Sequence, residues 1–576
     1  MKIKILLIFL SISTLNFSQI PEIFAPGCAT HLPEILTPSS SPTDCENFNI
    51  LSRAFDDLFI PQSSSTITII KVNLIFVQRN DGTGNFQENN TEHQSIIDGW
   101  INIINERFSS INNSRDPNCN PNPHYFISDS RIRFEFNKIY IRDSYGWNNS
   151  GGNTCPEYPN WYLNYLDEQI INNPSYTRGI NIYFTEDKTN YLNLVENQTT
   201  TEYNGNGLAC SQFPITNDFT ASSRIHVPDR YSKYWWMKNI CPSLYPDNTW
   251  DPDIKNWLIQ GEGVGIAHEI GHSLNLFHEC PGYYVANGCD NALMSQCGTC
   301  LRQFVPPTEL GRMHAAIALT NVRTFAIQNY NPIPIQISSA RHFNIRVNLL
   351  QSIEIVSGGY LTISCDLKIH PQAEVRVKSG GMCIMNESTI NSDGTSFKGI
   401  VVENGAYLEL KSYAMNNQSI EIESGGTLRI SEELFLSGRS KIDIKQGAYI
   451  CIENGTSIEL QEPLDVINLH NGYISGVNTN VVPNPGNCIV NPVNISIIGS
   501  GSINTYSEDI YLQDMTFTED NYVTGRYIYV GKAVTQSLPT GNVYVNSGIE
   551  VILDADIDVI VDDGFEIRSG GIFEIH

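Results

Sequence analysis

Apolar and polar residues alternate in two different ways along this chain, and the change falls near residue 332. Before it, short runs with a period of two, typical of strands, take turns with longer stretches that have helical apolar spacing. Strands are expected at residues 67–77, 131–141, 180–184 and 224–227, and helices at 93–108, 160–171 and 253–277. This order predicts an α/β region.

After PIPIQISS at 332–339 the helical pattern ends and a repeat begins. In each copy two alternating arms flank a Gly-Gly or Gly-Ala pair, with inward apolar residues such as Ile420, Ile422, Leu428 and Ile430. Glycine supplies bend conformations closed to other residues. The first glycines of the copies fall at 358, 380, 405, 425, 447, 548 and 570. The pattern predicts an all-β repeat domain, a parallel β-solenoid whose coils bury their inward residues against their neighbours. A row of β-hairpins is the alternative.

The N-terminus MKIKILLIFLSISTLNFSQ has two lysines, an apolar run and then small and polar residues, the pattern of a secretory signal peptide. We therefore expect a secreted protein or one on the extracellular surface. The expected divisions are 1–19 signal peptide, 20–65 prosegment or N-terminal extension, 66–331 α/β domain and 332–576 β-repeat domain. Few contacts are expected to cross the joint at 332–339.

The chain is strongly acidic, with 35 Lys and Arg against 61 Asp and Glu, a net charge of −26. Such a charge opposes binding to nucleic acid. Clustered carboxylates could hold structural Ca²⁺, although no loop has convincing Ca²⁺ spacing. No transmembrane segment is expected, since the longest apolar run, ITIIKVNLIFV, is interrupted by Lys71.

Fourteen cysteines in an exported chain favour disulfide bonds, although their connectivity is open. Four of them, Cys280, Cys289, Cys297 and Cys300, are close together in the sequence. Two disulfides are the preferred interpretation of this group, and a second zinc site is the alternative.

The segment HEIGHSLNLFH at 268–278 has the spacing of a metal site. His268 and His272 lie four apart and share one face of a helix, which suits two ligands of one Zn²⁺. Glu269 falls beside the metal, where a carboxylate can take a proton from zinc-bound water. His278 would be carried off this face unless the helix ends first. Asn275 stands where that turn is needed and readily accepts the left-handed conformation.

These residues resemble the metzincin zinc-protease motif HExxHxxGxxH, with Asn275 in place of the glycine. The resemblance is nearest to the pappalysin-like and cytophagalysin-like group and is most specific over 264–315. It implies a metzincin-like catalytic domain, a zinc cofactor, and Met294 in a turn that packs beneath the metal. It departs from several metzincin families at Gln296, where they have a tyrosine, and Glu279 is more like the astacins.

Cys28, in PGCATHLP, resembles the Cys-Gly-Thr of pappalysin-like prosegments. That resemblance implies a zymogen switch in which the Cys28 thiolate takes the fourth zinc position. A Cys28–Cys45 disulfide is the alternative.

Together these features predict a secreted zinc metalloendopeptidase that acts on protein or peptide substrates, with His268, His272 and His278 as ligands and Glu269 as general base. The β-repeat domain would be a spacer or stabilising stalk, or it would contact a cell surface or matrix. The alternative function is a cell-surface adhesive or structural β-repeat protein whose protease domain is secondary or inactive.

Overall fold

The structure is a computed structural model of the 576-residue chain. It describes residues 45, 52–113, 126–148, 164–203, 209–215, 221–240, 252–278, 292–294, 302–327, 329–392, 396–445, 448–452, 456–470, 496–500, 502–506, 510–512, 514–517, 521–534 and 541–575. The expected signal peptide, Cys28, Glu279, Gln296 and the four clustered cysteines lie outside these residues. No helix of the described part is long and apolar enough to cross a membrane.

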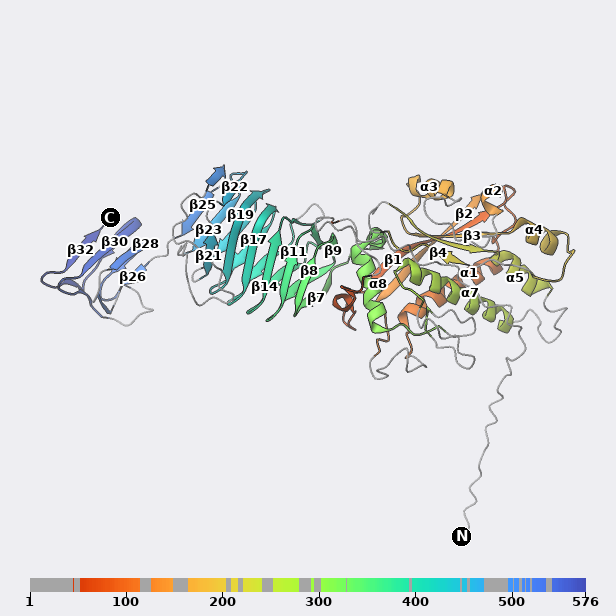
Figure 1. The fold of residues 1–576 in the computed structure, drawn as a ribbon, viewed down its shortest axis with the longest axis horizontal. Helices are drawn as coiled ribbons and strands as arrows, with labels where there is room; N and C mark the ends of the chain where they lie inside the picture. Colours follow the sequence, from red (N-terminus) through yellow and green to blue (C-terminus); the bar gives the residue numbers. More distant parts are fainter. Residues whose placement is uncertain are drawn as a thin grey trace, which may run out of the picture.

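The first part is an α/β region built on one twisted sheet, as the sequence predicts (Figure 1). Its strands follow the order β2-β1-β3-β5-β4. The short strand β6 pairs with the N-terminal part of β1. The β1, β2, β3 and β5 strands are parallel, whereas β4 and β6 are antiparallel to their neighbours. Their bounds are β1 Thr68–Gln78, β2 Ile132–Arg142, β3 Ile180–Thr185, β4 Cys210–Ser211, β5 Ser223–Pro228 and β6 Ala326–Ile327.

Helices cover both faces of this sheet (Figure 1). The long helices α1 and α7 pack against each other and bury their apolar residues with those of β1, while α2 and α3 contribute to the core of the other face. Asn90 caps α1 by accepting from the backbone N–H groups of Glu92 and His93. The bounds are η2 Asp56–Phe59, α1 Thr91–Ser109, α2 Ser144–Trp147, α3 Asn164–Asn172, α4 Lys188–Tyr191, η3 Leu192–Glu196, α5 Arg230–Asn239, α7 Pro252–Ser273, α8 Pro307–Leu319 and η4 Asn321–Thr324.

The second part is a β region of stacked parallel sheets. One sheet has the order β25-β23-β20-β18-β16-β13-β10-β7, a second has β24-β22-β19-β17-β14-β11-β8 with β21 beside β19, and a third has β15-β12-β9. Neighbouring strands come from successive repeats, so equivalent residues stack in register, as Ile353 does on Val375. The bounds are β7 Asn331–Ile337, β8 Ala340–Phe343, β9 Val347–Leu349, β10 Gln351–Ile355, β11 Tyr360–Ile363, β12 Leu367–Ile369, β13 Glu374–Val377, β14 Met382–Asn386, β15 Ile390–Asn391, β16 Gly399–Val402, β17 Tyr407–Asn416, β18 Ser419–Ile422, β19 Thr427–Ser437, β20 Lys441–Ile444, β21 Tyr449–Ile452, β22 Ser457–Leu460, β23 Val466–His470, β24 Ser496–Gly499 and β25 Ser502–Tyr506.

Two smaller parallel sheets follow, with the orders β26-β28-β30-β32 and β27-β29-β31. They bury an apolar cluster of their own that includes Val543, Val545, Val551 and Leu553. The bounds are β26 Ile510–Leu512, β27 Met515–Phe517, β28 Asn521–Val530, β29 Val543–Val545, β30 Glu550–Val561, β31 Phe565–Ile567 and β32 Ile572–Ile575.

The repeat glycines occupy the bends, as predicted. Among the described copies, the first glycine always has a positive φ, between 72° and 89°, and Gly447 lies outside the described residues. The bends are also bonded to one another: the N–H of Gly358 donates to the carbonyl of Gly380, that of Gly380 to Gly405, and that of Gly405 to Gly425. All described strand pairs of this region are parallel, which excludes the row of hairpins because hairpin strands are antiparallel.

The expectation that few contacts cross the joint near residue 332 is wrong. One apolar cluster runs from the β region into α8 and into the segment around η2, because the inward residues of the first repeat would otherwise face solvent. Phe55 packs edge-on against Phe343, with the ring centroids 5.8 Å apart. The α/β-region members of this cluster are Phe55, Phe59, Ala315, Ala318 and Leu319.

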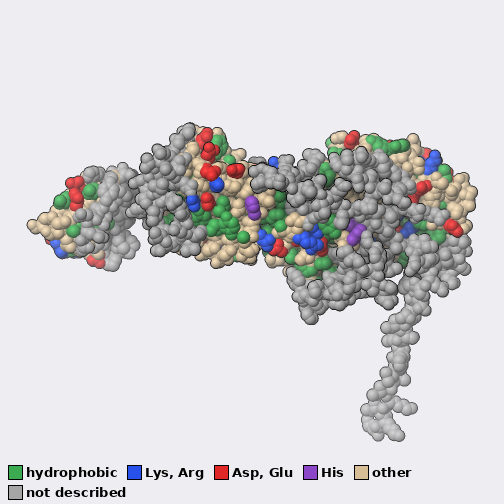
Figure 2. Space-filling view, in the orientation of Figure 1, with side chains coloured by type: hydrophobic (Ala, Val, Ile, Leu, Met, Phe, Trp, Pro, Cys, Tyr) green, Lys and Arg blue, Asp and Glu red, His purple; other side chains and the backbone are tan. Residues whose placement is uncertain are grey.

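Polar and covalent bonds reinforce the same junction. A disulfide joins Cys45 to Cys365, so the alternative Cys28–Cys45 pairing is wrong. Arg341 of β8 pairs with Asp57 of η2 and donates to the backbone carbonyl of Ala54. Basic and acidic side chains lie side by side where the two regions meet (Figure 2). The segment around η2, expected to be a prosegment or an extension, is therefore attached to both regions.

Candidate metal centre

Helix α7 ends at Ser273, before His278, as predicted. A continuous helix would place His278 on a different face from His268 and His272. Asn275 has a φ of 69°, the left-handed conformation expected of it. The N–H of Asn275 donates to the carbonyl of His272, and the N–H of Leu276 donates to that of Gly271. This pair of bonds is the Schellman motif, which satisfies the last carbonyls of a helix while the chain turns. The chain then runs back toward the helix and delivers His278.

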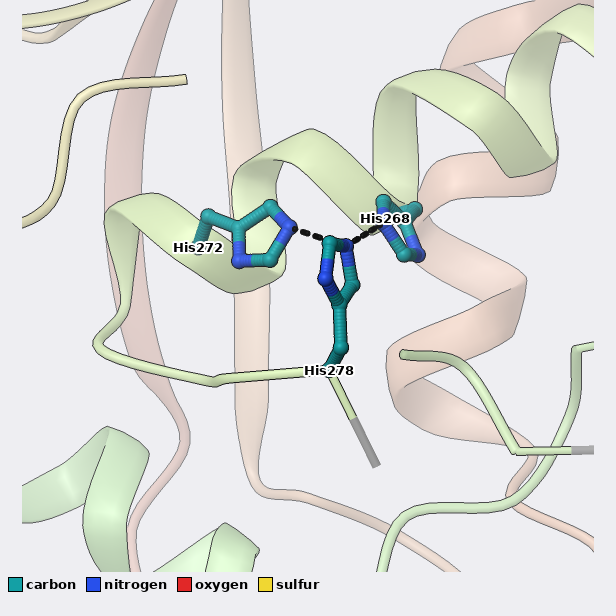
Figure 3. Close-up of side chains that lie close together, drawn as sticks. All are labelled: His268, His272 and His278. Atoms are coloured by element: carbon teal, nitrogen blue, oxygen red, sulfur yellow. Dashed lines mark hydrogen bonds between the residues drawn. The ribbon is translucent and has the colours of Figure 1, made fainter. Parts of the chain in front are cut away.

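Three imidazoles converge at this turn (Figure 3). His268 and His272 project from α7, and His278 reaches between them from the returning segment. The Nε2 atom of His278 lies 3.3 Å from Nε2 of His268 and 3.2 Å from Nε2 of His272. One ligand atom from each ring therefore lies within 4.8 Å of the others.

The other nitrogen of each helical histidine contacts a backbone carbonyl. Nδ1 of His268 lies 2.9 Å from the carbonyl oxygen of Leu293, and Nδ1 of His272 lies 2.7 Å from that of Leu276. A carbonyl oxygen can only accept, so each Nδ1 carries the proton and each Nε2 presents a lone pair to the centre of the group. Metal-binding histidines are oriented in the same way by such outer contacts.

Burial keeps these rings neutral. It lowers the pKa of all three histidines below 6.5 and that of His272 to about 3. The positive charge of Arg302 lowers the pKa of each ring further. A neutral imidazole is the form that binds a metal.

The donor set fits a divalent cation such as Zn²⁺. The three ligand nitrogens lie within 4.8 Å of one another, so their lone pairs can bind a single cation together. Imidazole nitrogen is a preferred zinc ligand, and three protein ligands leave a position open for chemistry. Among the described residues, this is the one group of three or more histidine, cysteine or carboxylate side chains that could hold a metal. The expected structural Ca²⁺ therefore has no candidate group within those residues.

Met294 lies directly beneath the helix that carries the histidines. It is fully buried, and a β-carbon added to Gly271 would lie 2.5 Å from its sulfur. The preceding residue, Leu293, supplies the carbonyl that holds His268, and its own N–H donates to the carbonyl of Phe304. Met294 is therefore packed against the helix that carries His268 and His272, and the segment 292–294 contacts both this helix and the ring of His268.

Glu269 follows His268 on α7 and is only 2% exposed. Strand β4 lies beside α7, where Oγ of Ser211 and Oγ of Ser273 are 2.7 Å apart. The ring of Phe213, just after β4, meets that of His272 edge-on at 5.4 Å. Glu269, the general base expected from the sequence, therefore lies on the same helix as His268 and His272 and is shielded from bulk solvent.

Arg302 could not be found from any motif or spacing in the sequence. This residue is 2% exposed and adopts a positive φ of 45°. The charge of Arg302 lowers the pKa of His268 more than His272 does, although the rings of His268 and His272 are only 4.9 Å apart. The charge of this buried arginine thus acts on all three histidines, and its segment 302–304 is paired with 292–294.

No model of a known protein family matches the chain, and no curated protein matches it.

Proposed function

We propose that the protein is a secreted zinc metalloendopeptidase with a metzincin-like catalytic domain. The observation that carries this proposal is the convergence of three Nε2 atoms, two of them on rings whose Nδ1 contacts a backbone carbonyl. Such an arrangement orients the nitrogen lone pairs toward one point. A metal site requires this orientation, whereas the packing of a protein core does not.

His268, His272 and His278 would hold the metal. A bound zinc ion supplies a Lewis acid that polarises a peptide carbonyl and makes water nucleophilic at neutral pH. Glu269 would accept the proton of the attacking water and deliver it to the leaving amine. Its place beside His268 on the same helix supports this role.

Two further residues would assist without contributing a ligand. Met294 would fix the distance between α7 and the segment 292–294 by its contact with Gly271. The guanidinium of Arg302 would favour negative charge near the rings, which peptide hydrolysis develops on the carbonyl oxygen. This charge would partly replace the tyrosine that several metzincins have at the position of Gln296.

We further propose that the parallel sheets of the β region form a β-solenoid. In-register stacking of successive repeats, buried inward residues and the bonded glycine bends support this architecture. The β region would then serve as a spacer or as a surface for contact with a cell or matrix. Export would depend on residues 1–19.

Zinc analysis together with a cleavage assay tests the proposal. The purified chain should contain about one zinc ion, and it should cleave casein or gelatin. A chelator should abolish the cleavage, and added Zn²⁺ should restore it. A chain with neither zinc nor chelator-sensitive cleavage would contradict the proposal and favour the adhesive or structural alternative.

A further inference from the structure

We infer that Arg312 is a positioning residue that holds the third histidine of the metal site through the ring of Phe277. The inference rests on the proposed function, because it assigns a purpose to Arg312 only if a metal binds at the three histidines. It concerns helix α8, which contributes no histidine to the group.

The contact between Arg312 and Phe277 has the geometry of a cation–π pair. The guanidinium carbon lies 4.4 Å from the centroid of the Phe277 ring. Arg312 is 2% exposed, so the interaction is largely desolvated, where such contacts are strongest. Phe277 immediately precedes His278, so whatever fixes the ring also fixes the backbone that presents the ligand.

The ring of Phe277 is held by a second contact as well. It stacks on Phe213, with the centroids 4.8 Å apart and an interplanar angle of 25°. Phe213 in turn meets the His272 ring edge-on. Phe277 therefore connects Arg312 to both the second and the third histidine. Residues 274–278 belong to no helix or strand, so side-chain contacts such as these add to the backbone turn at Asn275 in setting the position of His278.

Arg312 is itself fixed from the junction between the two regions. Glu309, one turn earlier on α8, lies 4.0 Å from its guanidinium and also pairs with Arg53. Asp56 of η2 also acts on Arg312 electrostatically, and a β-carbon on Gly311 would lie 2.0 Å from the Asp56 carbonyl oxygen. This close approach places η2, which is tied to the β region, directly against the helix that carries Arg312.

Metal affinity measured in matched variants tests the inference. Arg312→Met removes the charge and keeps the length, Arg312→Lys keeps a cation, and Phe277→Leu keeps an apolar side chain without a ring. Arg178→Met is the control, since Arg178 also lies over a phenylalanine ring, that of Phe325, outside the histidine group. The readouts are the Zn²⁺ dissociation constant, measured by competition with a chromophoric chelator, and the visible spectrum of the Co²⁺-substituted protein.

We expect Arg312→Met and Phe277→Leu each to weaken Zn²⁺ binding on the order of tenfold and to alter the Co²⁺ spectrum, as loss of an outer contact does at other metal sites. Arg312→Lys should recover most of the affinity, and Arg178→Met should bind like the unaltered chain. The inference would be overturned if Arg312→Met kept the normal affinity and spectrum, or if Arg312→Lys were as impaired as Arg312→Met.

A failure of the inference differs from a failure of the proposed function. If the unaltered chain binds no Zn²⁺, the proposed function is wrong. If it binds Zn²⁺ and all four variants match it, only the role of Arg312 is wrong. Should Arg312→Met not fold, Phe277→Leu decides, because it retains the Arg312–Glu309 pair in α8.

Discussion

The sulfur of Met294 and the α-carbon of Gly271 are in such close contact that no side chain fits between them: a β-carbon at 271 would lie 2.5 Å from the sulfur. Gly271 stands between His268 and His272 on α7, and Met294 is fully buried. This contact therefore limits how closely α7 and the 292–294 segment can approach each other.

Gly271→Ala should accordingly disturb the site. Overpacking of this kind costs about 1–3 kcal/mol, and here the strain would move either α7 or Met294. We expect a lower thermal midpoint and weaker Zn²⁺ binding. Adding Met294→Ala makes room for the new methyl group and should restore part of the Zn²⁺ affinity, although the truncation itself lowers stability by about 2–5 kcal/mol. A double variant no better than Gly271→Ala alone would show that this contact does not set the position of the helix.

Glu269→Ala should separate metal binding from catalysis. It leaves the three histidines in place, so the zinc content should stay near one per chain, while cleavage should fall roughly 10²–10⁴-fold with the loss of the base. His272→Ala, the matched change of a proposed ligand, should lose both zinc and cleavage. Near-normal cleavage by Glu269→Ala would rule out the assigned mechanism.

Asn275 offers a test of the turn that returns the chain to the metal site. Its φ of 69° suits glycine, so Asn275→Gly should keep the affinity for Zn²⁺. Valine is β-branched and disfavours this conformation, at a cost of about 1–3 kcal/mol, so Asn275→Val should misplace His278 and weaken Zn²⁺ binding. Equal affinity in the two variants would mean that the left-handed turn is not required.

Local spacing was sufficient to predict the helix, its end at Asn275 and the meeting of His268, His272 and His278, because these depend on residues within a few turns of one another. The repeat glycines were equally predictable, since each bend demands the same backbone conformation. Arg302 and Arg312 could not be found in this way. They come from segments that only tertiary packing brings to the histidines, and a lone arginine has no periodic pattern. The Cys45–Cys365 bond, which spans 320 residues, was hidden for the same reason.

If few contacts crossed the joint at 332–339, a chain ending near residue 332 would keep zinc and cleave small peptides. The shared apolar cluster changes this expectation, because truncation would expose Phe55, Phe59 and the outer face of α8. We expect such a chain to have a lower thermal midpoint and to associate at high concentration. Full stability of the truncated chain would show that the cluster contributes little.

A double change of Cys45→Ser and Cys365→Ser in the full chain should lower stability by about 2–4 kcal/mol.

Acid should destabilise the metal-free protein partly through His226. Burial, with a smaller contribution from the charge of Arg230, lowers the pKa of this ring to about 3. The unfolded chain therefore binds the proton first, and stability falls as the pH drops from 6.5 toward 3, by about 1.4 kcal/mol per pH unit from this group. His226→Gln should reduce the loss in thermal midpoint between pH 7 and pH 5. An unchanged pH dependence would exclude a contribution from His226.

The bonds between glycine bends have a consequence for how this molecule can vary in length. Gly358, Gly380, Gly405 and Gly425 each continue the same pattern, so gaining or losing one whole repeat would leave the remaining pattern intact. Each such step would shift the distal end by one strand spacing, about 4.8 Å, without touching the histidines. The distance between the three histidines and the far end of the β region could therefore change in fixed increments of one repeat, while the residues around the histidines stay the same.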